Sequence, residues 1–188
     1  MPEVRRIPGE GGVWLLVGGD LLAFSLFFLV FSYYRHLQPE VFEAARQTLN
    51  RRIGLTNTLV LLTSSLFVAI GVRRVLADRA GAGRMFLAAM GCGGLFIVLK
   101  AVEYGQKIAH GITPLTNDFY LYYFAFTGIH LAHVVIGSGG LFVMAQVSRR
   151  EASPTRSLIV ECGATFWHLV DLLWIMLFAL FYLAGGHG

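Results

Sequence analysis

Five long apolar stretches constrain the fold of this chain more than any other feature of its sequence. They cover residues 13–33, 55–75, 85–104, 119–147 and 158–183. An α-helix of about 20 apolar residues, each rising about 1.5 Å, is long enough to cross the hydrocarbon core of a bilayer. The sequence therefore predicts an all-α fold, an integral membrane bundle of five transmembrane helices, with the whole of 1–188 as a single membrane domain.

The overall composition indicates the same class of protein. Hydrophobic residues make up 56% of the 188 residues and charged residues 14%, with a mean hydropathy of +0.65. Soluble domains average about 45–50% apolar and about 25% charged residues. The net charge of +4 does not indicate a nucleic-acid partner, because the basic residues lie beside the apolar stretches, where they set membrane topology.

The distribution of Lys and Arg predicts how the bundle is oriented, because basic residues favour the cytoplasmic side of a bilayer. The excess places the N-terminus in the cytoplasm and the C-terminus outside. The N-terminal segment and the second and fourth connections hold nine basic residues: Arg5, Arg6, Arg73, Arg74, Arg79, Arg84, Arg149, Arg150 and Arg156. The first and third connections hold five: Arg35, Arg46, Arg51, Arg52 and Lys107.

The connections and the small residues give further expectations about the fold. Pro39 opens a segment that predicts a short surface helix, since proline is favoured in the first turn of a helix. Residues 105–118 are expected to form a loop. Two glycine-rich blocks, GCGGLFIV at 91–98 and GSGGLFVM at 137–144, predict close approach of neighbouring helices.

Polar and aromatic side chains interrupt the fourth and fifth stretches near their middle. Residues three or four apart share one face of a helix, so each set forms a stripe. Ionisable groups at bilayer depth are unfavourable unless they face protein. We therefore expect both stripes to mark helix packing or a contact with a partner subunit or lipid. The two sets are Thr127, His130 and His133, and Trp167, His168, Asp171 and Trp174.

Three further ionisable residues lie within the first and third stretches. Asp20 interrupts the first stretch, and Lys100 and Glu103 share one face near the end of the third. Burial disfavours a charged carboxylate, so Asp20 is expected to be protonated or hydrogen-bonded to a neighbouring helix. Lys100 either pairs with Glu103 or extends to the membrane interface, as long basic side chains do. All three are candidates for buried polar groups related to proton uptake.

Four interpretations of these polar residues stay open when only the residues are considered. Histidines and carboxylates bind metals or haem, although the sequence contains no ExxH pattern of the kind found in di-iron bundles. Acids and histidines also relay protons. Buried polar groups otherwise satisfy one another between helices or contact a partner. We favour these last two roles and predict no catalytic, cofactor-binding or metal-binding residue in this chain.

Five blocks occur in an order that resembles the subunit III family of haem–copper oxidases. The block at 126–137, FTGIHLAHVVIG, is similar to the family's Thr-Gly-x-His-x-x-His-Val pattern and is the most specific. The block at 167–174, WHLVDLLW, is similar to its Trp-His-x-Val-Asp pattern. The remaining blocks lie at 19–28, 55–65 and 103–104, the first of them with aspartate where the family usually has glutamate.

The resemblance implies a non-catalytic accessory subunit of a terminal cytochrome oxidase or a nitric oxide reductase. Such a subunit holds no haem or copper and packs against a catalytic subunit that contains haem and copper or iron. Phospholipid binding and support of assembly, stability and proton uptake are also implied. The family has seven helices, and this chain resembles its short five-helix form found beside nitric oxide reductases. The implied location is the bacterial inner membrane, as a multi-pass protein.

Two alternatives come from other classes of membrane protein. A stand-alone haem-binding oxidoreductase would use His130 or His168 as an axial ligand of haem. A small transporter would move its substrate without any partner subunit. A visible absorption spectrum of the purified chain and an uptake assay in liposomes separate these alternatives from an accessory subunit.

Overall fold

The computed structural model describes residues 11–183 of the chain, and this part consists of helices joined by short connections. Five of its helices are long and apolar enough to cross a membrane, which confirms the predicted all-α, five-span architecture. The helices are α1 (Gly11–Leu37), α2 (Pro39–Gln47), α3 (Arg51–Leu76), α4 (Ala82–Ala109), α5 (Asp118–Val147) and α6 (Pro154–Phe178), and a π-helix, η1 (Ala179–Leu183), follows α6.

Side-chain caps fix where several helices begin. The side-chain oxygen of Asn50 accepts a hydrogen bond from the backbone N–H of Arg52 at 3.0 Å. Asn117 and Ser153 cap α5 and α6 in the same way. Such caps satisfy backbone donors that have no partner inside the helix. Pro39 occupies the first turn of α2, which confirms the short helix predicted after the first span.

The third span is longer than its sequence pattern predicted. It was expected over residues 85–104 with a loop from 105, whereas α4 continues to Ala109. The polar residues in this last turn resemble loop sequence, yet Lys107 is buried and its ammonium lies over the ring of Tyr123, 5.4 Å from the centroid. The polar residues therefore belong to a packed helix face, and the expected loop is confined to the residues between α4 and α5.

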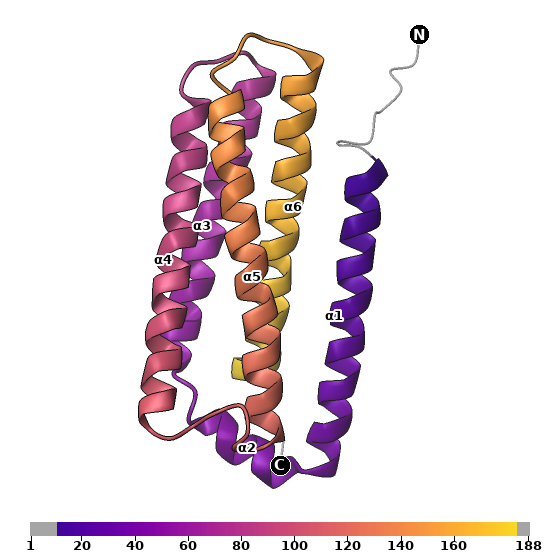
Figure 1. The fold of residues 1–188 in the computed structure, drawn as a ribbon, viewed down its shortest axis with the longest axis vertical. Helices are drawn as coiled ribbons and strands as arrows, with labels where there is room; N and C mark the ends of the chain where they lie inside the picture. Colours follow the sequence, from indigo (N-terminus) through magenta and orange to yellow (C-terminus); the bar gives the residue numbers. More distant parts are fainter. Residues whose placement is uncertain (1–10, 184–188) are drawn as a thin grey trace.

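Four helices, α3 to α6, form the body of the bundle, and α1 lies at its edge against α5 and α6 (Figure 1). The short α2 lies at the end of the bundle where α1 finishes (Figure 1). Helix α6 and η1 form the most enclosed span, with 56% of the apolar window buried, against 6% for α1. Helix α1 therefore offers most of its surface to lipid or to another protein.

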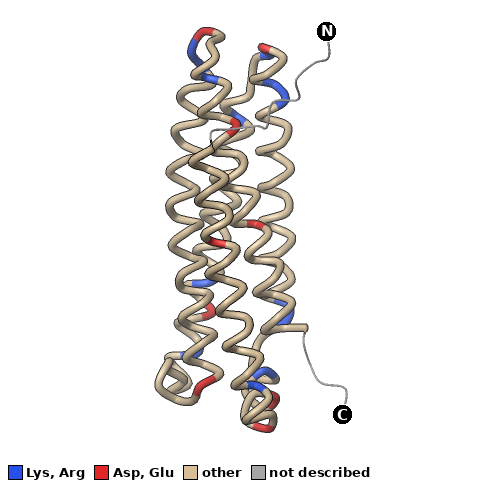
Figure 2. Tube along the Cα trace, turned by 90° about the vertical axis from the view of Figure 1, so that its right-hand side faces the viewer, with Lys and Arg blue, Asp and Glu red and all other residues tan. Residues whose placement is uncertain are grey.

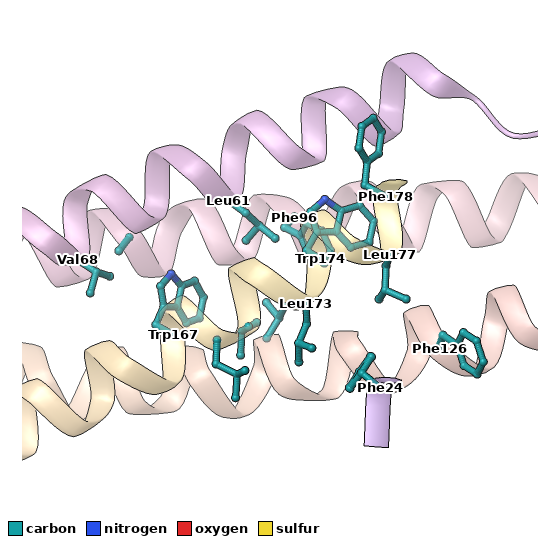
Figure 3. Packing of buried hydrophobic residues seen from close by; sticks show 14 of the residues in the cluster. Phe24, Leu61, Val68, Phe96, Phe126, Trp167, Leu173, Trp174, Leu177 and Phe178 are labelled. Carbon is teal, nitrogen blue, oxygen red and sulfur yellow. The ribbon is translucent and has the colours of Figure 1, made fainter. Parts of the chain in front are cut away.

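Two tryptophans of α6 occupy the centre of the core. Trp174 packs edge-on against Phe96 of α4 with ring centroids 4.8 Å apart (Figure 3). Trp167 lies against two glycines: a methyl group placed on Gly137 would come within 2.7 Å of its ring, and one on Gly93 within 3.0 Å. The close approach predicted from the glycine-rich blocks is thus confirmed at these two positions, where only the lack of a side chain admits the indole.

Charged residues gather at the two ends of the bundle, and few lie along its middle (Figure 2). This distribution is the one expected of helices whose central turns face hydrocarbon. The few ionisable groups at membrane depth are therefore the candidates for a specific structural or functional role.

Candidate functional site

The most deeply buried charges in the described chain belong to Lys100 and Glu103, one turn apart on α4. Their side chains are essentially inaccessible to solvent, and Lys100 Nζ lies 2.8 Å from Glu103 Oε2. Of the two predicted positions for Lys100, the structure has the inward, paired one. A buried ion pair is stable only when further hydrogen bonds satisfy both groups, so the neighbouring residues decide what this pair can do.

Two tyrosines complete a hydrogen-bonded cluster around this pair, which we call the Lys100 cluster (Lys100, Glu103, Tyr123 and Tyr182). Lys100 Nζ donates to the hydroxyl of Tyr123 at 3.0 Å, and Tyr182 donates its hydroxyl proton to Glu103 Oε1 at 2.7 Å. The ammonium also lies 4.9 Å from the ring centroid of Tyr123, within the range of cation–π attraction. The cluster thereby joins α4, α5 and η1.

Neither Tyr123 nor Tyr182 was among the predicted site residues, so their part in the cluster was missed. A buried tyrosine hydroxyl normally has a hydrogen-bond partner, so the presence of these tyrosines within apolar spans was a signal that each forms a polar contact. Finding which partner required the structure, because Tyr182 and Glu103 are 79 positions apart in the chain.

A pocket of about 380 Å³ at the end of the bundle reaches the Lys100 cluster, since Glu103 forms part of its wall. The other lining residues come from the end of α4, the loop after it and the segment between α2 and α3. They are Thr48, Asn50, Gln106, Lys107, His110 and Ile112.

Thr127 is buried on α5, as its stripe predicted, and it is fully hydrogen-bonded. Its hydroxyl donates to the carbonyl oxygen of Tyr123 at 2.5 Å. Because a threonine hydroxyl carries a single proton, the 2.5 Å contact with the Tyr104 hydroxyl must have Tyr104 as the donor. Thr127 therefore links α4 to α5 one turn away from the Lys100 cluster.

His130 is fully buried between aromatic rings. Its imidazole lies 5.5 Å from the ring of Phe96 and 5.3 Å from that of Trp174, measured between centroids. Neither ring nitrogen has a hydrogen-bond partner within the part of the chain that the structure describes. His130 is thus held in the core by packing against the rings of α4 and α6.

Asp20 of α1 and His133 of α5 form a second, partly exposed pair, with Asp20 Oδ2 3.4 Å from His133 Nε2. His133 Nδ1 lies 2.8 Å from the carbonyl oxygen of Ile129, and only a protonated Nδ1 makes that hydrogen bond. The pair connects α1 to α5 near the middle of the bundle.

The stripe predicted on the fifth span divides into an inward and an outward part. Trp167, Asp171 and Trp174 are buried. His168 points outward, with 42% of its side chain exposed, and its Nδ1 lies 2.6 Å from Ser65 Oγ on α3 and 4.0 Å from Asp171 Oδ2. The carboxylate oxygens of Asp171 have no hydrogen-bond partner among the described residues.

Trp174 connects α6 to α3 through a chain of two hydrogen bonds. Its Nε1–H donates to Thr58 Oγ1 at 3.0 Å, and the Thr58 hydroxyl donates to the carbonyl oxygen of Gly54 at 2.9 Å. Thr58 lies in the block at 55–65 that carried part of the family resemblance. That block therefore contributes a partner for the block at 167–174.

The predicted residues do not all meet at one centre. Lys100 lies close to two of the others, since its ammonium is 5.1 Å from the ring centroid of Trp174, which is 5.3 Å from that of His130. The Asp20–His133 pair joins α1 to α5, and the Ser65–His168–Asp171 group joins α3 to α6. No group of three or more His, Cys, Asp and Glu side chains with metal-ligand geometry occurs among residues 11–183. The arrangement joins helices to one another by polar contacts at several depths.

The fold and these groups define a multi-pass helical membrane protein with polar contacts between its spans. The chain belongs to the family described as cytochrome c oxidase subunit III, whose family model matches residues 10–186. The family predicted from the five sequence blocks is confirmed.

Curated relatives give the same assignment. The chain is 31% identical over 136 residues to cytochrome c oxidase subunit 3 of Corynebacterium diphtheriae, covering 71% of this chain and 66% of that protein. It is 27% identical to cytochrome bo(3) ubiquinol oxidase subunit 3 of Pseudomonas aeruginosa, covering 93% and 84%. It is 25% identical to quinol oxidase subunit 3 of Bacillus subtilis, covering 93% and 86%.

The chain spans just under two thirds of the first of these relatives and most of the other two. All three are named as oxidase subunits. The resemblance to the short form found beside nitric oxide reductases stays a prediction.

Proposed function

We propose that this chain is the accessory subunit III of a haem–copper respiratory oxidase and carries out no redox step of its own. In this role it packs against a catalytic subunit that holds the haem and copper and stabilises that subunit in the membrane. Membership of the subunit III family is the observation that carries the proposal. A nitric oxide reductase, with haem and iron in its catalytic subunit, is the second candidate partner.

The Lys100 cluster supports a scaffold role. All of its ionised and hydroxyl groups are engaged within the chain, and they tie α4 to α5 and η1. A group committed to structural hydrogen bonds is poorly placed to bind a substrate. The cluster therefore favours a subunit that holds helices in position over a small transporter.

The Asp20–His133 pair supports a further part of the proposal, that the subunit assists proton uptake by its partner. A carboxylate beside an imidazole, contributed by two different spans, is a suitable proton relay. Asp20→Asn removes the carboxylate, so we expect faster loss of turnover with time in the assembled complex. Unchanged turnover and unchanged decay would remove this part of the proposal and leave the scaffold role.

A bound phospholipid is also part of the proposal. A pocket of about 950 Å³ lies between the end of α1 and α2, with an apolar floor that includes Phe31 and Phe42 and a charged rim that includes Arg35, Glu43 and Arg46. Such a combination suits acyl chains and a head group. Lipid analysis of the purified subunit, with Arg35→Gln as the comparison, tests whether a lipid is retained there.

We further propose that the subunit lies in the bacterial inner membrane with its N-terminus in the cytoplasm, as the Lys and Arg distribution predicts. An alkaline phosphatase fused after residue 188 should then be active, since this enzyme folds only outside the cytoplasm. A fusion that is inactive there, but active in the loop between α3 and α4, would reverse the orientation.

Co-purification in mild detergent tests the main proposal. The tagged chain should bring down a haem-bearing catalytic subunit, while the chain purified alone in strong detergent should show no Soret band. A Soret band from the isolated chain would favour the haem-binding alternative, with His130 or His168 as ligand. Uptake by liposomes that contain only this chain would favour the transporter. The identity of the haem protein distinguishes an oxidase from a nitric oxide reductase.

A further inference from the structure

His168 is an outward-facing imidazole at the middle of a membrane span. It lies at the midpoint of the span Pro154–Leu183, and its contact Ser65 lies near the midpoint of α3. With 42% of its side chain exposed, it is more open than the two histidines near the middle of α5, His130, which is fully buried, and His133, whose side chain is 19% exposed and lies beside Asp20. His168 therefore presents a polar group where the bilayer offers only hydrocarbon.

Ser65 engages Nδ1 of His168, and the Nε2 atom has no hydrogen-bond partner in the part of the chain that the structure describes. Acyl chains neither donate nor accept hydrogen bonds, and water is scarce at this depth. An unpaired polar group in hydrocarbon is therefore unfavourable. Polar side chains at this depth normally face protein, so the structure indicates that another protein covers His168.

Exposed aliphatic side chains lie along the same faces of both helices. Leu172 and Ile175 follow His168 along α6 at the three- and four-residue spacing of one helix face, and Leu62 lies one turn before Ser65 on α3. Leu172 is 46% exposed. A polar residue beside exposed aliphatic residues is typical of a helix–helix contact in membranes, where an interhelical hydrogen bond is accompanied by close packing.

The outward residues at comparable depth on α4 and α5 differ in character. Leu95 and Val98 of α4, and Val135 and Ile136 of α5, are exposed and aliphatic. Lipid chains cover such positions without leaving a polar atom unpaired. The need for a protein cover is therefore stronger on the α3–α6 side of the bundle than on these faces.

We propose that Leu62 and Ser65 of α3 with His168, Leu172 and Ile175 of α6 form a docking face for one transmembrane helix of the catalytic subunit. We call it the α3–α6 face. The docked helix presents a hydroxyl or amide side chain to His168 Nε2, since these groups serve as donor or acceptor and so match either tautomer of a neutral imidazole. This inference rests on the proposed function and adds the face by which the subunit binds its partner.

The test compares two surface tryptophans in the complex isolated with mild detergent. Leu172→Trp enlarges a residue on the α3–α6 face, and Val98→Trp enlarges an exposed residue on α4, 57% exposed. Haem recovered per tagged subunit is the measurement. We expect Leu172→Trp to reduce it about tenfold or more and Val98→Trp to leave it unchanged, since overpacking affects only a position that contacts protein.

His168→Leu separates docking from folding. Leucine loses the hydrogen bond to Ser65 but suits a lipid-facing position, so the thermal midpoint of the isolated subunit should change little. The lost hydrogen bond to the docked helix should nevertheless reduce haem recovery about three- to tenfold. A histidine with only an internal structural role would give the opposite result, a lower midpoint with unchanged haem recovery.

Several outcomes would overturn the α3–α6 face. Reduced haem recovery with Val98→Trp but not with Leu172→Trp would place the partner on another face. Unchanged haem recovery with both variants would show that lipid covers the α3–α6 face. A photo-crosslinking residue at position 172 should also form an adduct with the haem-bearing subunit, and one at position 98 should not. If the unmodified chain recovers no haem protein at all, the proposed function itself fails, which is a distinct result.

Discussion

A buried ion pair stabilises a fold only while both charges remain matched, because each ion loses its solvation on burial. Lys100 and Glu103 meet this condition through their mutual contact and the two tyrosine hydroxyls. Lys107 lines the same pocket as Glu103, but Lys100 is the cation that forms an ion pair with Glu103 among the described residues. The sensitivity of the Lys100 cluster to substitution should therefore be asymmetric: removal of one charge is severe, and removal of both is mild.

Lys100→Met is expected to lower the free energy of unfolding in detergent by about 3–5 kcal/mol, because Glu103 is left as an unpaired buried carboxylate. The double variant Lys100→Met with Glu103→Gln should recover most of this loss. Thermal or denaturant unfolding of the two variants and the unmodified protein measures the effect. Equal stability of the single variant and the unmodified protein would show that Glu103 is already neutral or solvated.

Gly137 gives a second prediction at the scale of one residue. A methyl group at this position would overlap the indole of Trp167, whose ring atoms lie 2.7 and 2.9 Å from the added carbon. Gly137→Ala should therefore destabilise the bundle by about 1–3 kcal/mol, the usual effect of overpacking. Gly139→Ala is the matched control, since nothing lies within 4 Å of its added carbon. Equal thermal midpoints for the two variants would contradict the packing.

The direction in which a polar side chain points was predictable from the sequence for some residues and not for others. The inward stripes containing Thr127, His130 and Trp174 were predictable, because helical spacing alone fixes which positions share a face. The outward direction of His168 was not, since Asp171 three positions later shares its polarity but faces the core. Polarity tells which residues need a partner, and only the packing of neighbouring helices tells which partner they meet.

At the scale of elements, Arg156 connects the start of α6 to the end of α3. Its guanidinium donates to the carbonyl oxygen of Val75 and to Asp78 Oδ1, both at 2.8 Å, and to the carbonyl oxygen of Arg150 at 3.0 Å. Arg156 itself is buried, whereas the Asp78 side chain is mostly exposed. The backbone carbonyls therefore depend on this contact more than the carboxylate does.

Arg156→Gln should lower the free energy of unfolding by about 1–3 kcal/mol, because a buried guanidinium loses its hydrogen bonds and the Val75 carbonyl oxygen keeps only the backbone N–H of Asp78 as donor. Asp78→Asn removes the exposed charge and keeps a residue that tolerates the positive φ of 48° at this position. Its effect should stay below about 1 kcal/mol, as for other exposed pairs. Chemical unfolding of both variants ranks the contacts, and a larger effect for Asp78→Asn would show that the ion pair dominates.

The five spans were predictable as elements because their length and apolar content suffice to identify a membrane helix. The end of α4 was not, since Gln106 and Lys107 read as loop residues until α5 is packed beside them. The Lys100 cluster was also beyond prediction as a unit, because it needs η1, whose Tyr182 is 59 positions from Tyr123. Length is a local property of the sequence, and contact between distant spans is not.

At the scale of the whole molecule, the described chain divides into a well-packed body, α3 to α6, and the more loosely held α1. Aromatic residues near the C-terminal end of α1 make its firmest attachment. Phe31 is buried, with its ring centroid 5.2 Å from that of Phe42 on α2 and 5.0 Å from that of Phe181 on η1. Helix α1 is therefore fixed mainly at the end where it meets α2.

Phe31→Ala should release α1 from the bundle while α3 to α6 stay assembled. Truncating a buried phenylalanine removes about 3–5 kcal/mol of packing in protein cores, and Phe31 contacts α2, α5 and η1 but takes no part in the Lys100 cluster. Limited proteolysis between α1 and α3 in detergent should become faster. Leu29→Ala is the control, because Leu29 is 69% exposed and faces outward. If both variants were cut at the same rate as the unmodified protein, contacts nearer the N-terminal end, such as the Asp20–His133 pair, would have to hold α1 in place.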